Sequence, residues 1–597
     1  MDFLHHILAF DENSPLLFTQ FYFWAFFALV YALFALILSN DKSHITNHKL
    51  PITNRKLHLR NIYLLFVSWF FYYKTSGLFL LILAFVTISD WLIARRIKAN
   101  SDRPAAKLWL TLSVVIDLSL LFYFKYAYFF TNVINDWFHA DFRVFDIFAY
   151  IGNGFANAGR FSVDVIVLPV GISFYIFQVI SYTCDVFRKK IEPVKNILDF
   201  GFYVSFFPQL VAGPIVRAEE FIPQLYKPFR LSRRVFGIAI FWILNGLAKK
   251  IILSDYLAVN LIDRVFDNPL LFSGFENLFA LFAYSLQVYA DFSGYTDIAI
   301  GVAMLMGFYL PMNFNSPYKS QNPQEFWRRW HMSLGRWLKT YLYIPLGGNR
   351  TILGRKASKL WAANFNSFIT QVLGGLWHGA SWNFVLWGAI NGAGMIINKF
   401  WREWNWHVRF AIMTVLTASL CILDYYTDLP VWRLFAVWAA IIWFGTAVRY
   451  IYWLCTQDKQ ITNYQLQITN KIAQVWAILQ TFAFITFTRL FFRSSSNLDP
   501  ATANEVAWAT AKNMVNQIGG AWSNAIIPSF LWEYRWVVAM FVAGMIIHWL
   551  PTDWKRRYRL WFSAMPLWLI VLAVCAAIVV IYQFVTADMQ PFIYFQF

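Results

Sequence analysis

Long apolar runs alternate with short polar and basic segments along the whole of this sequence. The runs reach the roughly 17 to 25 residues that a helix needs to cross a bilayer, and they recur from Pro15–Leu38 to Leu567–Thr586. Of the 597 residues, 59% are hydrophobic and 14% are charged, whereas soluble domains are roughly 25% charged. Met1–Ser14 has no basic n-region, so we expect the first run to remain as a span. The pattern predicts an all-α polytopic membrane protein.

The positive charge of the chain lies between the apolar runs. A formal net charge of +18 suits a nucleic-acid partner in a soluble protein, but here Lys and Arg cluster in loops, as the positive-inside rule describes. We therefore expect a lipid bilayer and no nucleic acid as partner. With the basic segments in the cytoplasm, the alternation predicts about fourteen crossings and both termini outside. The basic segments are Lys42–Arg60, Arg95–Lys107, Arg188–Lys195, Arg217–Arg234, Lys319–Lys359, Lys399–Arg409 and Lys555–Arg559.

The simplest organisation is a single membrane domain over residues 1–597. We expect N-terminal spans in residues 1–160, a catalytic core in residues 161–400 and C-terminal spans in residues 401–597, the last two of which look appended. Two segments with a seven-residue ITN spacing, Ile45–Leu57 and Ile461–Ile472, are typical of loop insertions without a catalytic role. The four cysteines show no C-x-x-C spacing, so we expect neither a disulfide nor a metal site.

Three apolar stretches carry polar or helix-breaking residues at a depth where these are costly. Leu168–Gln178 contains Pro169 and Gly171, and Phe206–Arg217 is too short and too rich in Pro and Gly for a full crossing. Tyr289–Asp297 places two carboxylates in what the charge pattern makes one long, broken crossing. Irregular backbone and buried charge are tolerated in a membrane only where protein or a water-filled cavity covers them. We therefore predict a re-entrant segment and a polar cavity.

A fourth stretch, Asn322–Arg350, combines aromatic and basic residues at helical spacing. One face carries the apolar positions, and Arg329, Ser333, Arg336 and Lys339 occupy the other. The pattern predicts an interfacial amphipathic helix on the cytoplasmic side. His331 falls on the apolar face, where it is either a functional group or a structural core histidine. The apolar face is formed by Phe326, Trp327, Trp330, Leu334, Trp337, Leu338 and Tyr341.

His378 lies in the stretch Gly374–Gly388, GGLWHGASWNFVLWG, inside a largely apolar region. The charge pattern places it at a turn between two helices toward the outer half of the membrane, on the far side from His331. Neighbouring glycines permit close approach of the backbone or a positive φ. A neutral imidazole there suits the removal of a proton from a hydroxyl group. The alternative is a histidine packed between tryptophans for structural reasons.

At these motifs the sequence resembles the membrane-bound O-acyltransferase family, and within it the membrane subunits of bacterial alginate and related polysaccharide O-acetyltransferases. Five motifs occur in order, and the resemblance runs over most of the chain, densest from about Leu168 to Gly392. They are FFPQLVAGPIVR (Phe206–Arg217), YADFSGYTDIAIG (Tyr289–Gly301), the segment Asn313–Arg350, GGLWHGASWNFVLWG (Gly374–Gly388) and TFTRLFFRS (Thr486–Ser494).

The resemblance implies a fold, a reaction and a pair of histidines. The fold would be a funnelled helical bundle with a thin floor, where a donor from the cytoplasm meets an acceptor from outside. The reaction would be acyl transfer, above all acetyl transfer, from acetyl-CoA or a similar thioester substrate, with no bound cofactor. His378 would be the catalytic histidine and act as general base. His331, the second histidine of the pair, or a nearby donor would orient the acyl group or stabilise the oxyanion.

Further residues are assigned a role only through the same resemblance. Asn383 and Asp291 would line the cavity, although a polar contact between helices accounts for them equally well. A set of basic residues would contact either the phosphates of a CoA donor or lipid headgroups; these are Arg328, Arg329, Arg336 and Lys339.

The resemblance also implies partners and leaves the acceptor open. An extracytoplasmic hydrolase-like acetyltransferase would complete transfer to the polymer, and the chain would lie in the cytoplasmic (inner) membrane. The acceptor is an exopolysaccharide, peptidoglycan, a lipid-linked glycan or, through D-alanyl transfer, a teichoic-acid-like polymer. Two other classes compete: a secondary transporter, which should show two matching halves with interrupted helices, and an export scaffold, which has no use for a cavity histidine.

Overall fold

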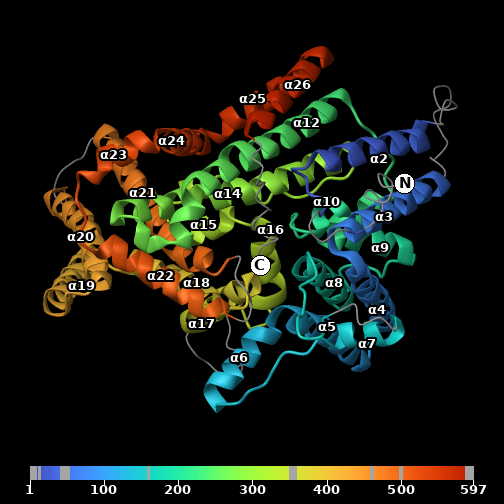
Figure 1. Cartoon of the computed structure of the whole chain (residues 1–597), viewed down its shortest axis with the longest axis horizontal. Coiled ribbons are helices and arrows are strands. Elements are labelled where there is room, and N and C mark those ends of the chain that lie inside the picture. The colour runs from blue at the N-terminus through green and yellow to red at the C-terminus, as the bar shows by residue number, and fades with distance from the viewer. Residues whose placement is uncertain are drawn as a thin grey trace. The chain divides into compact units, whose positions relative to one another are not determined.

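The computed structural model describes residue 10 and residues 15–39, 54–156, 162–348, 359–456, 463–496 and 502–584 (Figure 1). Within these ranges the chain forms helices and no strand, which confirms the all-α prediction. The first ITN segment lies outside the described residues up to residue 53, and its end begins α3 (Asn54–Ser76). The second is helical from Asn463 on, as the start of α21 (Asn463–Ser494), so its assignment as a loop is wrong.

Eight helices in the described part of the chain are long and apolar enough to cross a bilayer, or nine if the bent pair α23 (Ile526–Glu533) and α24 (Arg535–Trp549) forms one span. The chain is therefore a multi-pass membrane protein. Several other helices, such as α8 (Ile172–Phe187) and α18 (Trp382–Glu403), are shorter or more polar. The count of about fourteen crossings stays a prediction.

The chain folds into two compact units that are interleaved in sequence. Unit 1 comprises residues 1–251, 292–312 and 553–596, and unit 2 comprises residues 252–291 and 313–552. The division into three consecutive segments stays a prediction. His331 and His378 both belong to unit 2.

In unit 1, α4 (Leu80–Ala99) packs against α5 (Ala105–Leu121) and α8. Gly171 precedes α8 with a φ of +76°, and a Cβ there would lie 2.7 Å from the Leu210 carbonyl oxygen. Only glycine satisfies both the left-handed backbone and the close approach. The interruption predicted at this position is confirmed.

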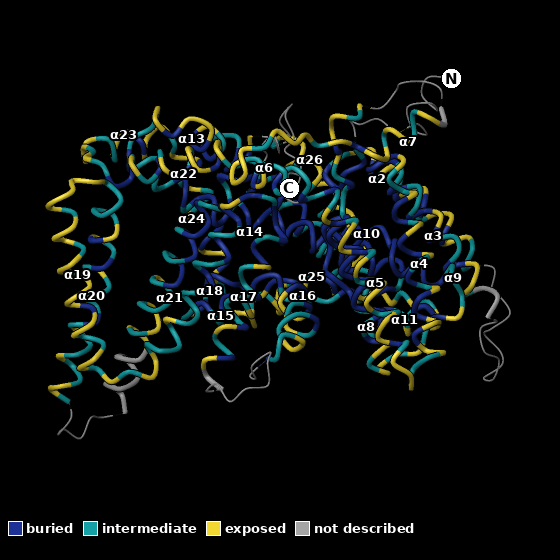
Figure 2. The backbone as a smooth tube through the Cα atoms, turned by 90° about the horizontal axis from the view of Figure 1, so that it is seen from below, coloured by how far each residue is buried: buried dark blue, intermediate teal, exposed yellow. Residues whose placement is uncertain are grey.

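The segment after α8 is short-helical and buried. It contains α9 (Ile197–Ser205) and the single turn α10 (Phe207–Leu210), continues through a turn and irregular chain, and ends at α11 (Ala218–Leu225). Every residue from 199 to 216 is buried, as the dark tube around α10 shows in Figure 2. The prediction that this stretch is too broken for a full crossing is confirmed, and its re-entrant path stays a prediction.

The predicted break in the run Tyr289–Asp297 is wrong. Helix α14 (Gly274–Leu305) continues through it as 32 helical residues. Gly294 serves close packing on α12 (Arg233–Leu247), because a Cβ there would lie 2.8 Å from the Gly246 carbonyl oxygen. The Asp297 carboxylate is paired with the Lys249 ammonium at 2.6 Å. Burial of this carboxylate is therefore balanced by an ion pair.

In unit 2, four helices lie side by side: α17 (Lys359–His378), α18, α21 (Asn463–Ser494) and α22 (Ala503–Gly519) (Figure 1). Glycines set the contact between α17 and α18. A Cβ on Gly375 would lie 2.3 Å from the Phe384 carbonyl oxygen, and one on Gly388 would lie 2.5 Å from the Gln371 carbonyl oxygen. Small residues let helix backbones approach closely where the surrounding lipid is as apolar as the side chains.

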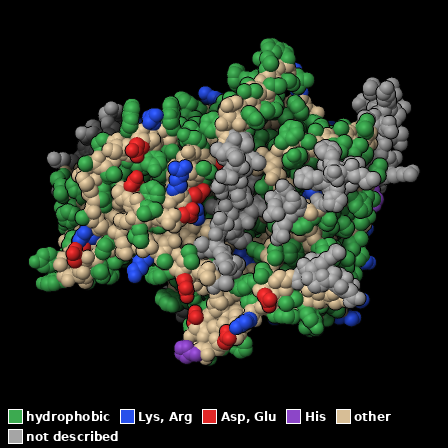
Figure 3. All heavy atoms as spheres, viewed as in Figure 1, with side chains coloured by type: hydrophobic (Ala, Val, Ile, Leu, Met, Phe, Trp, Pro, Cys, Tyr) green, Lys and Arg blue, Asp and Glu red, His purple; other side chains and the backbone are tan. Residues whose placement is uncertain are grey.

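The hairpin of α19 (Trp406–Thr427) and α20 (Pro430–Thr456) presents apolar side chains outward, and in Figure 2 the tube of α19 is largely exposed and that of α20 mainly intermediate. Val415 and Phe444 are among its exposed residues. Figure 3 shows hydrophobic side chains over much of the described surface on the face that it draws. Such a surface is expected of helices whose surroundings are lipid.

Candidate active site

The polypeptide around His331 is not the single amphipathic helix that the spacing predicts. It forms α15 (Pro323–Arg329), α16 (Met332–Trp337) and the π-helix η8 (Leu338–Tyr343). His331 separates the first two with a φ of +43°. A non-glycine residue in this left-handed region is uncommon, and it persists only where its surroundings hold it. The periodicity located the buried face correctly, since Trp330 and Leu334 are buried, but not the break.

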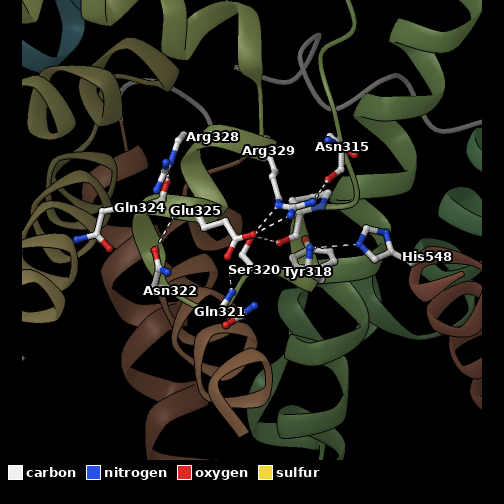
Figure 4. A network of polar contacts seen from close by, with 11 residues as sticks. Asn315, Tyr318, Ser320, Gln321, Asn322, Gln324, Glu325, Arg328, Arg329 and His548 are labelled. Atoms are coloured by element: carbon white, nitrogen blue, oxygen red, sulfur yellow. Dashed lines mark hydrogen bonds and ion pairs between the residues drawn. The ribbon is translucent and has the colours of Figure 1, made fainter. Parts of the chain in front are cut away.

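Helix α15 begins at a capping arrangement visible in Figure 4. The Asn322 side chain accepts a hydrogen bond from the Glu325 backbone N–H at 2.9 Å, and the Glu325 carboxylate accepts one from the Gln321 N–H at 2.9 Å. Pro323 occupies the first turn, where no hydrogen bond from its nitrogen is needed. The sequence NPQE therefore starts the helix that leads to His331.

The side chain of Asn313 fixes His331 from the neighbouring extended segment. Its Oδ1 accepts from the Ser333 N–H at 3.1 Å and the Ser333 hydroxyl at 2.9 Å, and it lies 3.2 Å from His331 Nδ1. The Asn313 carbonyl oxygen also accepts from the Met332 N–H at 2.9 Å. These bonds bury Ser333, which the periodicity had placed on the polar face; that assignment is wrong.

The contact with Asn313 also assigns the tautomer of His331. Since a carbonyl oxygen only accepts, the Nδ1 atom of His331 carries the proton and Nε2 is the acceptor nitrogen. Burial lowers the pKa of His331 to about 3, because a charged imidazolium is disfavoured away from water. His331 is therefore a neutral imidazole with a fixed orientation.

His378 is the last residue of α17, directly before the turn into α18. The structure confirms the predicted turn between helices. The imidazole is buried among three aromatic rings, with centroid distances of 4.9 Å to Trp377, 5.1 Å to Trp387 and 5.2 Å to Phe492. The following glycine is required by space, because a Cβ on Gly379 would lie 2.1 Å from the Phe384 ring. Of the two predicted reasons for glycines here, close approach holds and positive φ does not.

The two histidines share a neighbour. The indole of Trp377 lies 5.9 Å from the His331 ring and 4.9 Å from the His378 ring, centroid to centroid. Both imidazoles therefore border one aromatic side chain in unit 2. Their placement on opposite sides of a thin floor stays a prediction.

The other predicted site residues divide into buried and exposed groups. Asp291 and Asn383 are buried. Asn383 donates a hydrogen bond to the Ser494 hydroxyl at 3.0 Å, which joins α18 to α21. That contact is the polar helix–helix interaction that the sequence left as an alternative to a cavity-lining role.

Among the four predicted basic residues, Arg329 differs from the rest. Its guanidinium is paired with the Glu325 carboxylate at 2.7 Å and donates to the Asn315 carbonyl oxygen (Figure 4). Arg328, Arg336 and Lys339 are exposed. These three are accessible to phosphate or to lipid headgroups, and Arg329 stabilises α15.

Four further residues of unit 2 lie around Trp330, the neighbour of His331, or contact a residue that does, and were not assigned from the sequence: Tyr289, Tyr318, Arg489 and His548. The Tyr318 N–H donates to His548 Nε2 at 3.2 Å (Figure 4), and the His548 ring lies 4.5 Å from that of Tyr289. His548 belongs to α24, in a region that looked appended. Arg489 lies within the motif TFTRLFFRS, but the motif did not single it out. Among the described residues, no group of three or more His, Cys, Asp or Glu side chains is placed to hold a metal ion.

The chain is similar to known proteins over the region of this site. The family model of the membrane-bound O-acyltransferase family matches residues 114–413, a range that contains both histidines. The probable alginate O-acetylase of Pseudomonas aeruginosa is 41% identical over 344 residues, which are 57% of this chain and 61% of the relative. The peptidoglycan O-acetyltransferase of Helicobacter pylori is 32% identical over 382 residues, 60% of this chain and 67% of the relative.

A more distant relative is the teichoic acid D-alanyltransferase of Bacillus subtilis, 30% identical over 245 residues, 40% of this chain and 60% of the relative. The chain spans 61% and 64% of the length of the two alginate O-acetylases it matches in Pseudomonas aeruginosa and Azotobacter vinelandii. The family match covers half of the chain, and the peptidoglycan enzyme is matched over two thirds of its length. The chain therefore belongs to the membrane-bound O-acyltransferase family.

Proposed function

We propose that this protein is a membrane-embedded O-acyltransferase that moves an acetyl group from a thioester donor to a hydroxyl group of a cell-surface or secreted polysaccharide. The observation that carries the proposal is His378, a buried imidazole at a helix end, enclosed by aromatic rings and bordering the same indole as a second histidine. The names of the alginate and peptidoglycan relatives support a glycan acceptor.

In this proposal His378 is the general base. It accepts the proton of the acceptor hydroxyl as the oxygen attacks the thioester carbonyl carbon, which gives a tetrahedral oxyanion. Collapse of that intermediate breaks the carbon–sulfur bond, and the proton passes to the departing thiolate. The products are an ester and a thiol, so atoms and charge balance. The aromatic enclosure of His378 keeps water from competing with the hydroxyl.

His331 acts as a fixed acceptor in the same proposal. With its Nδ1–H directed at Asn313, its Nε2 accepts a hydrogen bond and does not donate one to an oxyanion. Of the two roles that the family resemblance implies, this supports orientation of the acyl group over stabilisation of the oxyanion. An N–H or O–H group of the donor or acceptor is the partner that suits Nε2.

The donor, the partner and the location complete the proposal. Acetyl-CoA or a similar thioester approaches from the cytoplasm, where the exposed Arg328, Arg336 and Lys339 contact its phosphates or lipid headgroups. A separate extracytoplasmic hydrolase-like protein passes the acetyl group to the polymer, and the chain lies in the cytoplasmic membrane. Asp291 lines the site, and Asn383 joins α18 to α21.

The first test is the acetate released by mild base from cell-surface polysaccharide in wild-type, deletion and His378→Ala strains at equal membrane expression. We expect the His378→Ala strain to match the deletion strain. Equal acetate in all three strains would contradict the proposal and favour a transporter or an export scaffold. The polymer that loses acetate identifies the acceptor.

A further inference from the structure

A fully buried cation lies beside the two histidines. Arg489, on α21, is among the largest side chains that are less than 2% exposed. Removal of a guanidinium from water costs several kcal/mol even after local relaxation. A buried charge is therefore expected to have a counter-charge.

The described residues provide Arg489 with an aromatic platform and a hydrogen bond with the Tyr318 side chain, but with no carboxylate. Its guanidinium carbon lies 4.0 Å above the Trp330 ring and 6.0 Å from the Phe492 ring. No described Asp or Glu pairs with it. A desolvated cation–π contact contributes about 2 kcal/mol, which leaves much of the desolvation cost unbalanced. The missing counter-charge is the first sign of a ligand.

The second sign is the pair of nitrogens that lack hydrogen-bond acceptors. Nε and Nη2 of Arg489 are both buried without a partner among the described residues. These two N–H groups lie on the same edge of the guanidinium and point in parallel. That edge matches two oxygens of one carboxylate or phosphate group, the bidentate geometry that arginine favours.

The surroundings of Arg489 connect it to both histidines. Trp330, under the guanidinium, directly precedes His331, and Phe492 lies 5.2 Å from the ring of His378. An anion bound to Arg489 would therefore lie at the site of the proposed reaction. A single oxyanion can accept from both donors, but two parallel N–H groups pair best with two oxygens of one group, the geometry that arginine favours.

One helical turn along α21, Arg493 shows what a structural arginine looks like in this unit. Its guanidinium is paired with the Asp263 carboxylate at 2.9 Å. The protein thus supplies a carboxylate to one arginine and none to the more deeply buried one. Arg493 is a matched control for experiments on Arg489.

We infer that Arg489 binds a two-oxygen anionic group, a carboxylate or a phosphate, of one of the two substrates. That an anion binds here rests on the geometry of Arg489. That the anion belongs to a substrate rests on the proposed function. A phosphate would belong to the thioester donor, and a carboxylate would belong to an acidic sugar of the acceptor. At least one substrate of the proposed reaction therefore carries a negative charge into the membrane domain.

The test measures binding by the purified full-length chain with paired probes that differ only in charge. Pantetheine 4′-phosphate is compared with pantetheine, and glucuronate with glucose. We expect the wild type to prefer the charged member of one pair, and Arg489→Lys, which keeps a charge but not the fork, to bind that member roughly 10- to 100-fold more weakly. The pair that discriminates identifies the source of the anion.

Arg493→Lys is the control and should keep the preference of the wild type. Equal binding of charged and neutral probes by the wild type, or an unchanged preference in Arg489→Lys, would overturn the inference. Because binding needs no turnover, anion preference in a chain that transfers no acyl group would refute the proposed function and leave this inference standing.

A second measurement uses only the wild type, so it does not depend on whether Arg489→Lys folds. Cryo-electron microscopy of the wild type with the preferred charged probe locates the bound anion. We expect its anionic group within hydrogen-bond distance of Nε and Nη2 of Arg489 and not beside Arg493. An anionic group bound elsewhere in the chain would overturn the inference.

Discussion

Asn313 holds both the side chain of His331 and the backbone that follows this histidine. One carbonyl oxygen of Asn313 contacts both the His331 ring and the Ser333 N–H and hydroxyl. The left-handed backbone of His331 is thus maintained by a residue 18 positions earlier in the chain. The orientation of the proposed site depends on this contact.

Removal of the Asn313 side chain should therefore disturb the site more than removal of a neighbour. We expect Asn313→Ala to lower acetyl transfer about 10-fold or more and to cost about 1 to 3 kcal/mol of unfolding free energy, since buried donors lose their acceptor. Turnover and thermal unfolding in detergent measure the two effects.

Asn315→Ala is the control, because the Asn315 side chain is exposed and its bonds to Arg329 use the backbone. It should resemble the wild type in both measurements. Equal effects of the two substitutions would contradict the role given to Asn313.

The depressed pKa of His331 predicts how stability depends on pH. In the folded chain this pKa is about 3, and the ordinary value is 6.5. Between these values the unfolded chain binds a proton that the folded chain does not, so stability falls as the pH drops from 6.5 toward 3. The contribution is at most about 1.4 kcal/mol per pH unit.

Thermal unfolding of wild type and His331→Gln between pH 4 and pH 7.5 measures this contribution. The slope of melting temperature against pH should be smaller in His331→Gln, which has no group to titrate. Parallel slopes would show that His331 is not held neutral. Because His331 stays neutral in the folded chain over this pH range, its titration should not contribute to the pH dependence of the reaction rate.

The contact between α17 and α18 predicts unequal tolerance of alanine at two glycines. Gly388→Ala places a Cβ 2.5 Å from the Gln371 carbonyl oxygen, so the helices must move apart. We expect a loss of about 1 to 3 kcal/mol and reduced activity. Gly374→Ala meets only the flexible Leu338 side chain, at 3.3 Å, and should be tolerated. Similar melting temperatures for the two variants would contradict the packing described.

The ion pair of unit 1 predicts a double-mutant result. Lys249→Met leaves the buried Asp297 carboxylate without its cation and should cost about 3 kcal/mol, a low figure because the lysine is 23% exposed. Lys249→Met combined with Asp297→Leu should recover most of that loss. Additive losses in the double variant, measured by thermal unfolding, would rule out the interpretation that the pair exists to neutralise a buried charge.

Several features of this fold follow from the sequence because they depend on local physics. Apolar run length predicts the helical membrane class, Gly171 predicts an interruption before α8, and the glycines near His378 predict a turn with close packing. Each depends on residues that are neighbours in the chain. The same holds for the buried face of the segment around Trp330 and Leu334.

Other features depend on partners far away in the chain. The helix break at His331 requires Asn313, and the continuous path of α14 requires Gly246 and Lys249 from α12 and its extension. Periodicity therefore predicted one helix where the chain breaks at His331, and the charge pattern predicted a break in α14 where there is none. Arg489 differs again, because only the absence of a nearby carboxylate in the folded chain distinguishes it from other arginines.

The most direct test of the account is acetyl transfer by purified, folded His378→Ala with a thioester donor and a glycan acceptor. His407→Ala is the control, since His407 lies exposed against Tyr450 and Trp453, away from the other histidines in the sequence. We predict that His378→Ala keeps the melting temperature of the wild type within a few degrees and loses transfer, whereas His407→Ala keeps both. Near-normal turnover by His378→Ala would contradict the central claim that this imidazole is the base of the reaction.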